Sequence, residues 1–202
     1  MTFFIGLTGG IATGKSTASQ VFKELGCPII DCDKIAHQQQ EVGQVTWRKI
    51  KDYFGNEFLN EDQTVNRKKL GKYVFSHPDE LKKLSEMSQG TVFDEIQIEM
   101  KRYSEEKVPV VIVDVPLLFE NNDKNIYDAT VLVAAPYDVE LDRLMKRNNL
   151  TKQEAEERIA SQMPLDDKRL LASYVVENTG TIDELRTKLK NILDQVMRKE
   201  GQ

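Results

Sequence analysis

Residues 9–16, with the sequence Gly-Gly-Ile-Ala-Thr-Gly-Lys-Ser, match the phosphate-binding-loop pattern G-x-x-x-x-G-K-[ST] at every fixed position. The apolar residues 3–7 before this loop are typical of a buried strand. After the loop, a helix that Gly26 can end is predicted by an apolar stripe at i, i+3, i+4 and i+7, formed by Ala18, Val21, Phe22 and Leu25. A strand, a glycine-rich loop and a helix in this order restrict the chain to α/β folds with an anion site at a helix start.

The residue types of this loop suit a nucleoside triphosphate such as ATP together with Mg²⁺. Glycines let the backbone approach phosphate oxygens, so that amide N–H groups at the helix start face the anion. Lys15 is predicted to bind the β- and γ-phosphates, and the Ser16 hydroxyl to complete the shell of the Mg²⁺ ion. The predicted nucleotide-binding residues of this segment are Gly10, Ala12, Thr13, Gly14, Lys15, Ser16 and Thr17.

Composition narrows the class of protein. The 202 residues carry 28 Lys and Arg against 33 Asp and Glu, a net charge of 28 − 33 = −5, which argues against general binding to nucleic acid or to an anionic membrane. Two cysteines and two histidines do not make a zinc site or a disulfide framework. No apolar stretch is long enough for a membrane span, and the N-terminus lacks signal-peptide features. We therefore expect a cytoplasmic enzyme with no nucleic-acid or membrane partner and no obligate protein partner.

Strand-type apolar runs alternate with helical patterns along most of the chain. The expected strands cover residues 3–7, 28–31, 108–114, 129–135 and 174–176. Helix starts are predicted at capping boxes that begin at Thr151 and Thr181, and at Ser76 before Pro78. Strands separated by helices indicate an α/β fold with a five-stranded parallel sheet flanked by helices and ligands at the carboxyl ends of the strands.

Residues 34–107 break this rhythm, because they contain helical patterns and no convincing strand pattern. The interval is far longer than an ordinary crossover connection. We therefore expect a nucleotide-binding core formed by residues 1–33 and 108–202, and a helical insert at 34–107 that holds an acceptor. A purely structural helical pack accounts equally well for most individual residues of the insert, so none of them is assigned a role.

Two carboxylates, Asp31 and Asp33, follow the second expected strand. Beside a phosphate loop, Asp33 is the candidate base for the proton of a substrate hydroxyl, while Asp31 would orient substrate or hold a metal-bound water. The alternative for a lone Asp after a strand is an N-cap of the next helix. Thr8, directly before the loop, either faces the acceptor or packs as an ordinary strand-end hydroxyl.

Asp114 ends the third expected strand, where a carboxylate of a phosphate-loop enzyme lies near the Mg²⁺ ion. It would bind the metal directly or through water, and an ordinary strand-terminal Asp is the alternative. The next residues, 115–120, are too apolar for an idle surface loop. They are interpreted as a substrate wall, with Glu120 as a polar contact.

Arg143 and Arg147 are spaced i,i+4 on a helix expected to begin near Asp138. Like charges at this spacing oppose each other slightly, so an anion is expected nearby. For Arg147 in particular we favour a functional role.

The capped helix that follows is predicted to carry Arg158 and Gln162 on one face and to be ended by Pro164. An arginine-rich helical hairpin at about residues 146–169 is what a phosphate-clamping lid looks like. A surface ion pair with Glu154 explains Arg158 almost as well. A solvated charged face is the prediction for Lys146, Lys168 and Arg169.

Several of these segments together resemble the dephospho-CoA kinase family. The resemblance rests on residues 6–17, on Asp31 with Asp33, on residues 114–120 and on Arg158 with Gln162, in matching order along nearly the whole chain. It implies a P-loop kinase-like core, a helical CoA-binding region and a lid. It also implies transfer of the ATP γ-phosphate to the ribose 3′-hydroxyl of dephospho-CoA, the last step of coenzyme A synthesis.

The same resemblance implies particular residue roles. Asp33 would be the base, Lys15 and Arg147 would stabilise charge, Thr8 would lie at the acceptor, and Asn178 would lie near the adenine. The roles of Asp31, Glu120 and Arg158 stay open.

Three positions depart from the family pattern. Ser173 stands where the pattern usually has Asp, which leaves the polar contact at that position open. Ala12 and Thr13 replace the commoner Gly and Ser, a change that the loop is expected to tolerate because its backbone does the binding.

Two other functions stay open at this point. A nucleoside or nucleoside-monophosphate kinase on the same scaffold would share the loop, the lid and the Asp, although the long insert favours a larger CoA-type acceptor. A nucleotide-dependent regulatory switch is the other alternative. Against it, the guanine-selecting sequence N-K-x-D is absent, and a switch has no obvious use for a carboxylate at a strand end.

Overall fold

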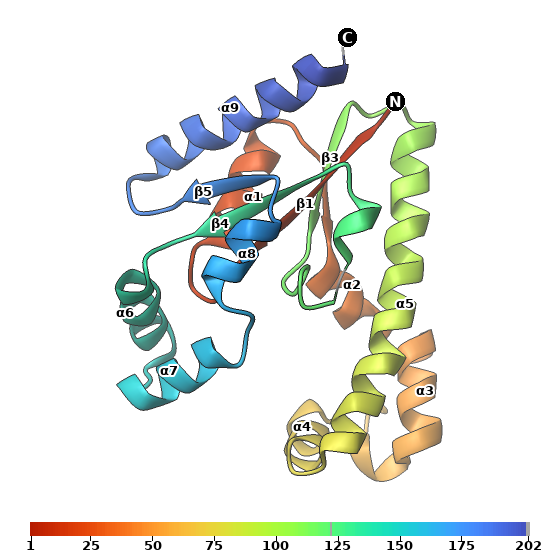
Figure 1. Cartoon of the computed structure of the whole chain (residues 1–202). Coiled ribbons are helices and arrows are strands. Elements are labelled where there is room, and N and C mark those ends of the chain that lie inside the picture. Colours follow the sequence, from red (N-terminus) through yellow and green to blue (C-terminus); the bar gives the residue numbers. More distant parts are fainter. Residues whose placement is uncertain (122, 201–202) are drawn as a thin grey trace. The chain divides into compact units, whose positions relative to one another are not determined.

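The computed structural model describes residues 1–121 and 123–200 and contains a five-stranded sheet with the order β2-β3-β1-β4-β5 (Figure 1). The central strand β1 pairs in parallel with β3 and β4, so that Ile5 lies opposite Ile112 on one side and Ala129 on the other. The edge strand β5 is parallel to β4. The strand bounds are Phe3–Gly9 (β1), Ile29–Asp31 (β2), Val110–Asp114 (β3), Ala129–Ala134 (β4) and Tyr174–Glu177 (β5). The prediction of a five-stranded parallel α/β sheet is confirmed.

Helices connect the strands, as the alternating pattern predicted. Their bounds are Lys15–Glu24 (α1), Cys32–Gln39 (α2), Val45–Phe54 (α3), Arg67–Phe75 (α4), Pro78–Glu105 (α5), Tyr137–Asn148 (α6), Lys152–Ala160 (α7), Leu165–Leu171 (α8) and Ile182–Glu200 (α9), with short 3-10 helices at Asn56–Phe58 and Asp123–Ile126. None of the helices in the described residues has the length and apolarity needed to cross a bilayer.

The chain divides into two compact units. The first comprises Met1–Ile30 and Tyr103–Gln202, and the second comprises Asp31–Arg102. The predicted division had placed these boundaries at residues 34 and 107.

The core of the first unit lies between one face of the sheet and the helices α1 and α9. Strand residues such as Ile5 and Val133 pack there against Phe22 of α1 and Leu189 of α9, and all four are buried. The apolar stripe predicted for α1 therefore faces the sheet. Gly26 follows this helix in a left-handed conformation, with φ +90°, and its N–H donates to the Lys23 carbonyl over 3.0 Å, so the predicted helix end is confirmed.

The second unit has a hydrophobic core of its own. Trp47, Ile50 and Phe54 of α3 pack against Phe58 and Leu70, and the Phe54 and Phe58 rings meet edge to face at 6.0 Å. Between residues 34 and 107, all of them described, no strand forms apart from an isolated bridge between Leu59 and Val65. This segment is helical, as its pattern predicted.

Local helix-start signals succeeded at two sites and failed at one. Thr151 and Thr181 begin α7 and α9 with the expected capping bonds. Ser76 was wrongly predicted as an N-cap: it ends α4, and its hydroxyl donates to the Tyr73 carbonyl over 2.8 Å. The hydroxyl thus bonds to a carbonyl of the preceding helix, because α5 begins only at Pro78.

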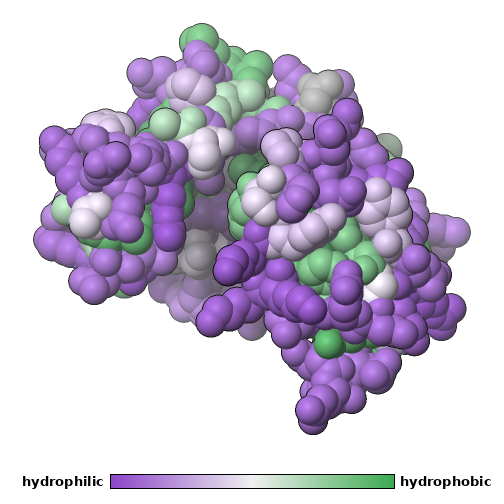
Figure 2. All heavy atoms as spheres, turned by 90° about the horizontal axis from the view of Figure 1, so that it is seen from below, coloured by the Kyte–Doolittle hydropathy of each residue, from purple (hydrophilic) through white to green (hydrophobic). Residues whose placement is uncertain are grey.

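The surface is predominantly hydrophilic on the face shown in Figure 2, and apolar residues form only small areas there. Charged residues make up 30% of the chain, which accounts for this appearance.

Candidate active site

The loop of residues 9–16 joins the end of β1 to the start of α1. Its turn is closed by Thr13, whose N–H and hydroxyl both reach the Gly10 carbonyl, over 3.3 and 2.9 Å. At the N-terminus of α1, Gly14 is the N-cap residue and provides no side-chain hydrogen bond. Amide groups at such a helix start are suited to bind phosphate.

Two glycines of this loop lie against side chains that leave little room for a Cβ. A Cβ at Gly14, where φ is +98°, would lie 2.1 Å from Asn178 Nδ2, and a Cβ at Gly10 would lie 2.6 Å from Glu140 Oε1. Ala12 also has a left-handed backbone, with φ +59°. An L-residue is strained there, so the loop accommodates alanine at a position where glycine would adopt the same conformation freely.

Lys15 and Asp114 form an ion pair across the first turn of α1 and the end of β3. Their side chains are only 19% and 8% exposed, so the Asp114 charge has a neutralising partner inside the protein. Asp114 and the exposed Ser16 together offer a carboxylate and a hydroxyl oxygen, which are the donors that Mg²⁺ prefers. The described residues hold no group of three or more His, Cys, Asp or Glu side chains suited to a metal. Such a sparse protein donor set fits Mg²⁺, which keeps water and substrate phosphates as its other ligands.

The two aspartates after β2 take different positions. Asp31 is the N-cap of α2, and its carboxylate accepts a 2.9 Å hydrogen bond from the Lys34 N–H. Asp33 lies in the first turn of α2 with an exposed side chain. The capping role that was the alternative for Asp33 is thus filled by Asp31. The assignment of Asp33 as base stays a prediction.

Thr8 is completely buried, and its hydroxyl donates to the Pro116 carbonyl over 3.2 Å. This is the packed strand-end hydroxyl that was the alternative, so contact with an acceptor stays a prediction. The run 115–120, interpreted as a substrate wall, contributes to the core as well. Leu118 and Phe119 are buried, whereas Leu117 is exposed.

The arginines of α6 have separate partners. Arg143 donates from Nη1 to the Asn178 carbonyl over 3.0 Å, which ties α6 to the end of β5. Arg147 is exposed and donates from Nε to Asn148 Oδ1 over 2.9 Å. Of the two guanidinium groups, that of Arg147 is the one left at the surface, as a residue of a lid would require.

Asn178 anchors the phosphate loop. Its side-chain amide donates to the Thr13 carbonyl over 2.8 Å, and its backbone N–H donates to Ala134 over the same distance. Sequence comparison with the family had implied only that this residue lies near the adenine.

Ser173, at a position where the resemblance left the polar contact open, makes a reciprocal pair with Thr130. Its Oγ accepts from the Thr130 N–H over 3.1 Å, and its N–H donates to Thr130 Oγ1 over 2.9 Å. Serine therefore joins the start of β5 to β4 without a carboxylate.

Gln162 was wrongly placed on the capped helix. α7 ends at Ala160, and Pro164 is the N-cap residue of α8, so Gln162 lies in the turn between the two helices. From this turn its Oε1 accepts a 3.1 Å hydrogen bond from the N–H of Ile11 in the phosphate loop. No local signal in the sequence indicates this bond, because its two residues are 151 positions apart.

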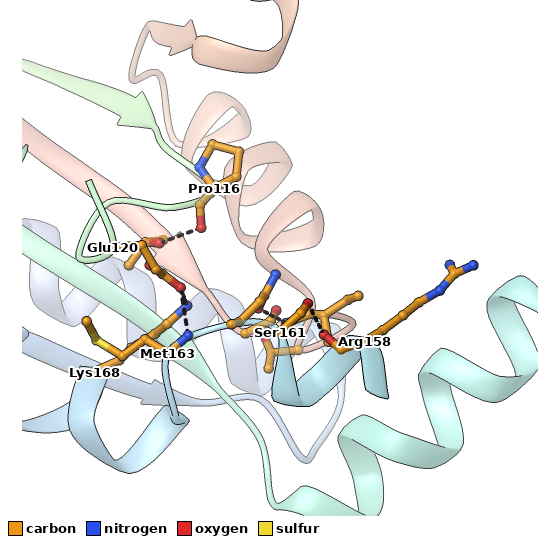
Figure 3. Close-up of polar contacts among 11 residues, drawn as sticks. Pro116, Glu120, Arg158, Ser161, Met163 and Lys168 are labelled. Atoms are coloured by element: carbon orange, nitrogen blue, oxygen red, sulfur yellow. Dashed lines mark hydrogen bonds and ion pairs between the residues drawn. The ribbon is translucent and has the colours of Figure 1, made fainter. Parts of the chain in front are cut away.

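Lys168 was wrongly assigned to a solvated charged face. Its side chain is 0% exposed, and Nζ lies 2.7 Å from Glu120 Oε1. Glu120 also accepts from the Met163 N–H over 3.2 Å, and Figure 3 shows these residues together while the Arg158 side chain extends away from them. No local signal in the sequence indicates this burial, because Lys168 and Glu120 are far apart along the chain.

Lys146 and Arg169, the other two residues predicted to lie on a solvated charged face, differ in their exposure. Lys146 is solvated as predicted, with a 76% exposed side chain that pairs with Asp142 over 2.8 Å. Arg169 is only 29% exposed and pairs with Glu177 and Asp166, and these bonds raise its pKa. The prediction of a solvated face is therefore wrong for Arg169 as well.

Glu140 of α6 is a further group that the sequence did not single out. It is 4% exposed and borders Gly10. Burial raises the pKa of its carboxyl, and the nearby charge of Lys168 partly opposes that rise. A buried acid thus lies beside the phosphate loop, within electrostatic reach of the buried Lys168.

The sheet order, the loop at the end of β1 and the Lys15–Asp114 pair define a phosphate-loop kinase fold. Shikimate kinase from Acinetobacter baumannii shares that fold, with a TM-score of 0.56 at 16% identity over 98% of this chain and 95% of its own.

The sequence profile of the dephospho-CoA kinase family matches residues 3–184, and the chain belongs to that family. It is 48% identical to dephospho-CoA kinase of Lactobacillus johnsonii over 198 residues, which cover 98% of this chain and all of the relative. The structure of dephospho-CoA kinase from Campylobacter jejuni superimposes with a TM-score of 0.76 at 26% identity, covering 99% of this chain and 100% of that one. The activity of the family is the ATP-dependent phosphorylation of dephospho-CoA.

Proposed function

We propose that this chain transfers the γ-phosphoryl group of ATP to the ribose 3′-hydroxyl of dephospho-CoA and so forms coenzyme A. The observation that carries the proposal is the family match over residues 3–184, joined to a phosphate loop whose lysine meets the strand-end Asp114. Phosphoryl transfer requires alignment, charge neutralisation and an acceptor for the hydroxyl proton. The chain has a candidate for each requirement.

Lys15 and a magnesium ion would neutralise the charge of the phosphates. Lys15 would leave Asp114 for the β- and γ-phosphates, and Asp114 with Ser16 would hold Mg²⁺ directly or through water. When bound, Mg²⁺ supplies charge that stabilises the phosphate oxygens. The ion pair supports this role because it keeps both residues at the mouth of the loop with their charges matched.

Asp33 would accept the proton of the attacking hydroxyl. Its carboxylate is exposed, and the adjacent helix is already capped by Asp31, so Asp33 has no structural duty at that helix end. Thr8 would lie at the acceptor, and Arg147 would stabilise the transferring group from the lid at residues 146–169. Asn178 would lie near the adenine while it holds Thr13.

The helical segment 34–107 is proposed to bind the CoA portion of the acceptor. Helices α3 and α4 and the first part of α5 share an apolar core that contains no residue of the sheet. An acceptor as large as dephospho-CoA needs more surface than a nucleotide core offers. The length of the segment supports this assignment over that of a simple crossover.

The test is to mix the protein with ATP, Mg²⁺ and dephospho-CoA and to analyse the products by mass spectrometry. A product heavier by one phosphate, with phosphorus NMR placing the new group on the 3′-oxygen, is expected. Parallel reactions with adenosine and with AMP in place of dephospho-CoA should give no phosphorylated acceptor. Phosphorylation of adenosine or AMP, without phosphorylation of dephospho-CoA, would overturn the proposal.

A further inference from the structure

The starting point is the burial of Lys168. An ammonium group with no solvent exposure has lost its hydration and needs carboxylates or other acceptors around it. Its ion pair with Glu120 joins α8 to the segment that follows β3. Lysine is almost never fully buried unless it is paired, so the burial of Lys168 depends on Glu120.

Glu120 depends on this lysine. One carboxylate oxygen, Oε1, accepts the Met163 N–H and forms the ion pair with Lys168 Nζ, which itself makes no hydrogen bond among the described residues. The other, Oε2, is buried and has no hydrogen-bond partner among the described residues. Without Lys168, Glu120 would be a partly buried charge held by one backbone N–H.

Met163 belongs to the turn between α7 and α8, and its neighbour Gln162 reaches the phosphate loop. Gln162 Oε1 accepts the N–H of Ile11 over 3.1 Å, which fixes the direction of the Gly10–Ile11 peptide. Glu140 also borders the loop, since a Cβ at Gly10 would lie 2.6 Å from Glu140 Oε1. The loop backbone is thus held at Ile11 by a turn that contacts Glu120, the partner of Lys168.

We propose that Lys168 is a positioning residue for the phosphate loop. Its charge holds Glu120, Glu120 holds the turn at residues 162–163, and Gln162 holds the Ile11 amide. Each link joins a pair of residues distant in sequence, and all of them lie in the unit that contains the sheet. A loop held in its binding conformation does not have to be ordered by the nucleotide, which raises affinity.

Two single variants and their combination test this series of contacts from Lys168 to Ile11. Lys168→Met removes the charge at nearly constant length, and Gln162→Ala removes the last link from a turn that is only partly buried. Lys190→Met is the matched control, because Lys190 is 60% exposed and pairs with Asp194 on its own helix. Affinity for ADP is measured by calorimetry, which does not depend on the acceptor, and amide exchange is followed by NMR.

Both single variants should bind ADP about three- to tenfold more weakly, the usual effect of one lost hydrogen bond. The double variant should be no weaker than the weaker single variant, since both changes break one path. Ile11 should exchange faster in all three, while Ile5 and Ile112 of the sheet keep the protection that they have in Lys190→Met. The KM for dephospho-CoA should stay unchanged, which separates this outcome from a failure of the proposed acceptor.

Wild-type ADP affinity in folded Lys168→Met would overturn the proposal. So would additive effects in the double variant, or faster exchange spread evenly over the sheet, which would indicate a loss of global stability. If Lys168→Met does not fold, Glu120→Gln with Lys168→Met takes its place, because that pair carries no buried charge. Wild-type ADP affinity in this replacement would equally refute the role of Lys168.

Discussion

Residues that look alike in the sequence serve different purposes in this molecule. Lys15 and Lys168 are both poorly exposed and both paired with a carboxylate, but Lys15 retains some contact with solvent whereas Lys168 has none. The proposed roles differ accordingly: Lys15 would move to a phosphate, whereas Lys168 would stay in place and hold a turn. Asp31 and Asp33 differ in the same way, because one caps a helix and the other is left exposed.

Replacing Asp33 tests the chemical step. Asp33→Asn should lower turnover about a hundredfold or more, the usual scale for a lost general base, and should leave ATP binding nearly intact. Steady-state kinetics and calorimetric titration with an ATP analogue measure the two effects. Lys15→Ala is the contrasting variant, because it should weaken both binding and rate. Unchanged turnover in Asp33→Asn would remove Asp33 from the mechanism.

The left-handed backbone at Ala12 predicts that a substitution by glycine changes the stability of the protein. A left-handed backbone costs an L-residue about 1–2 kcal/mol, while glycine loses about 0.5–1 kcal/mol through chain entropy. Ala12→Gly should therefore raise the free energy of unfolding by about 0.5–1 kcal/mol in urea denaturation. Ala36→Gly, within α2, is the control and should lower it by about 1 kcal/mol. A destabilised Ala12→Gly variant would show that the left-handed backbone at Ala12 carries little strain.

At the scale of elements, short local signals predict where helices begin, but not always which helix a residue serves. Thr151 and Thr181 each have an acid three residues later, and both caps formed. Ser76 carries a suitable side chain but lies two residues before Pro78, so it closes the preceding helix instead. Gln162 shows a further limit, because helical spacing from Arg158 says nothing about where α7 ends.

The cap of α7 predicts local stability in the segment proposed as a lid. Thr151→Ala removes the hydroxyl that accepts from the Glu154 N–H, and loss of an N-cap costs about 1 kcal/mol. Amides in Lys152–Ala160 should exchange faster, with those of α9 unaffected. Thr181→Ala is the matched control, since it should loosen the start of α9 and leave α7 unchanged. Equal protection of α7 in both variants would mean that tertiary contacts, rather than the cap, hold this helix.

At the scale of the whole molecule, a small sheet orders groups far apart in sequence around one loop. Asp114, Glu140 and Asn178 reach the loop from β3, α6 and the end of β5. Each comes from the carboxyl end of a strand or from the segment after it, which is where parallel sheets assemble their ligand sites. The loop and its neighbours therefore form through folding of the unit as a whole.

The buried Glu140 predicts how stability depends on pH. Its pKa in the folded state is raised above the ordinary 4.5, mainly because burial disfavours the charged form, with Lys168 acting in the opposite direction. Between the unfolded and the folded pKa, the folded state binds more protons, so this group lowers stability as pH rises through that window. The stabilising effect of protonated Glu140 is fully present only near and below pH 4.5.

Glu140→Gln isolates this contribution, because glutamine is neutral at every pH. Urea midpoints of wild type and variant should be compared from pH 4 upward, and the wild type should lose stability relative to the variant as pH rises. Glu184→Gln, an exposed capping residue, serves as the control for an acid outside the core. A constant difference between wild type and Glu140→Gln would contradict the raised pKa.

The order of strands and helices, the phosphate loop and the family follow from the sequence alone, because each depends on residues close together or on a recurring pattern. Periodicity reports which face of an element is apolar, and the loop pattern reports a backbone shape. Only the tertiary structure decided that Lys168 is buried against Glu120, that Gln162 holds Ile11, and that Asp31 rather than Asp33 caps α2. Burial and hydrogen bonding between distant segments depend on how the whole unit packs, and local composition does not encode that packing.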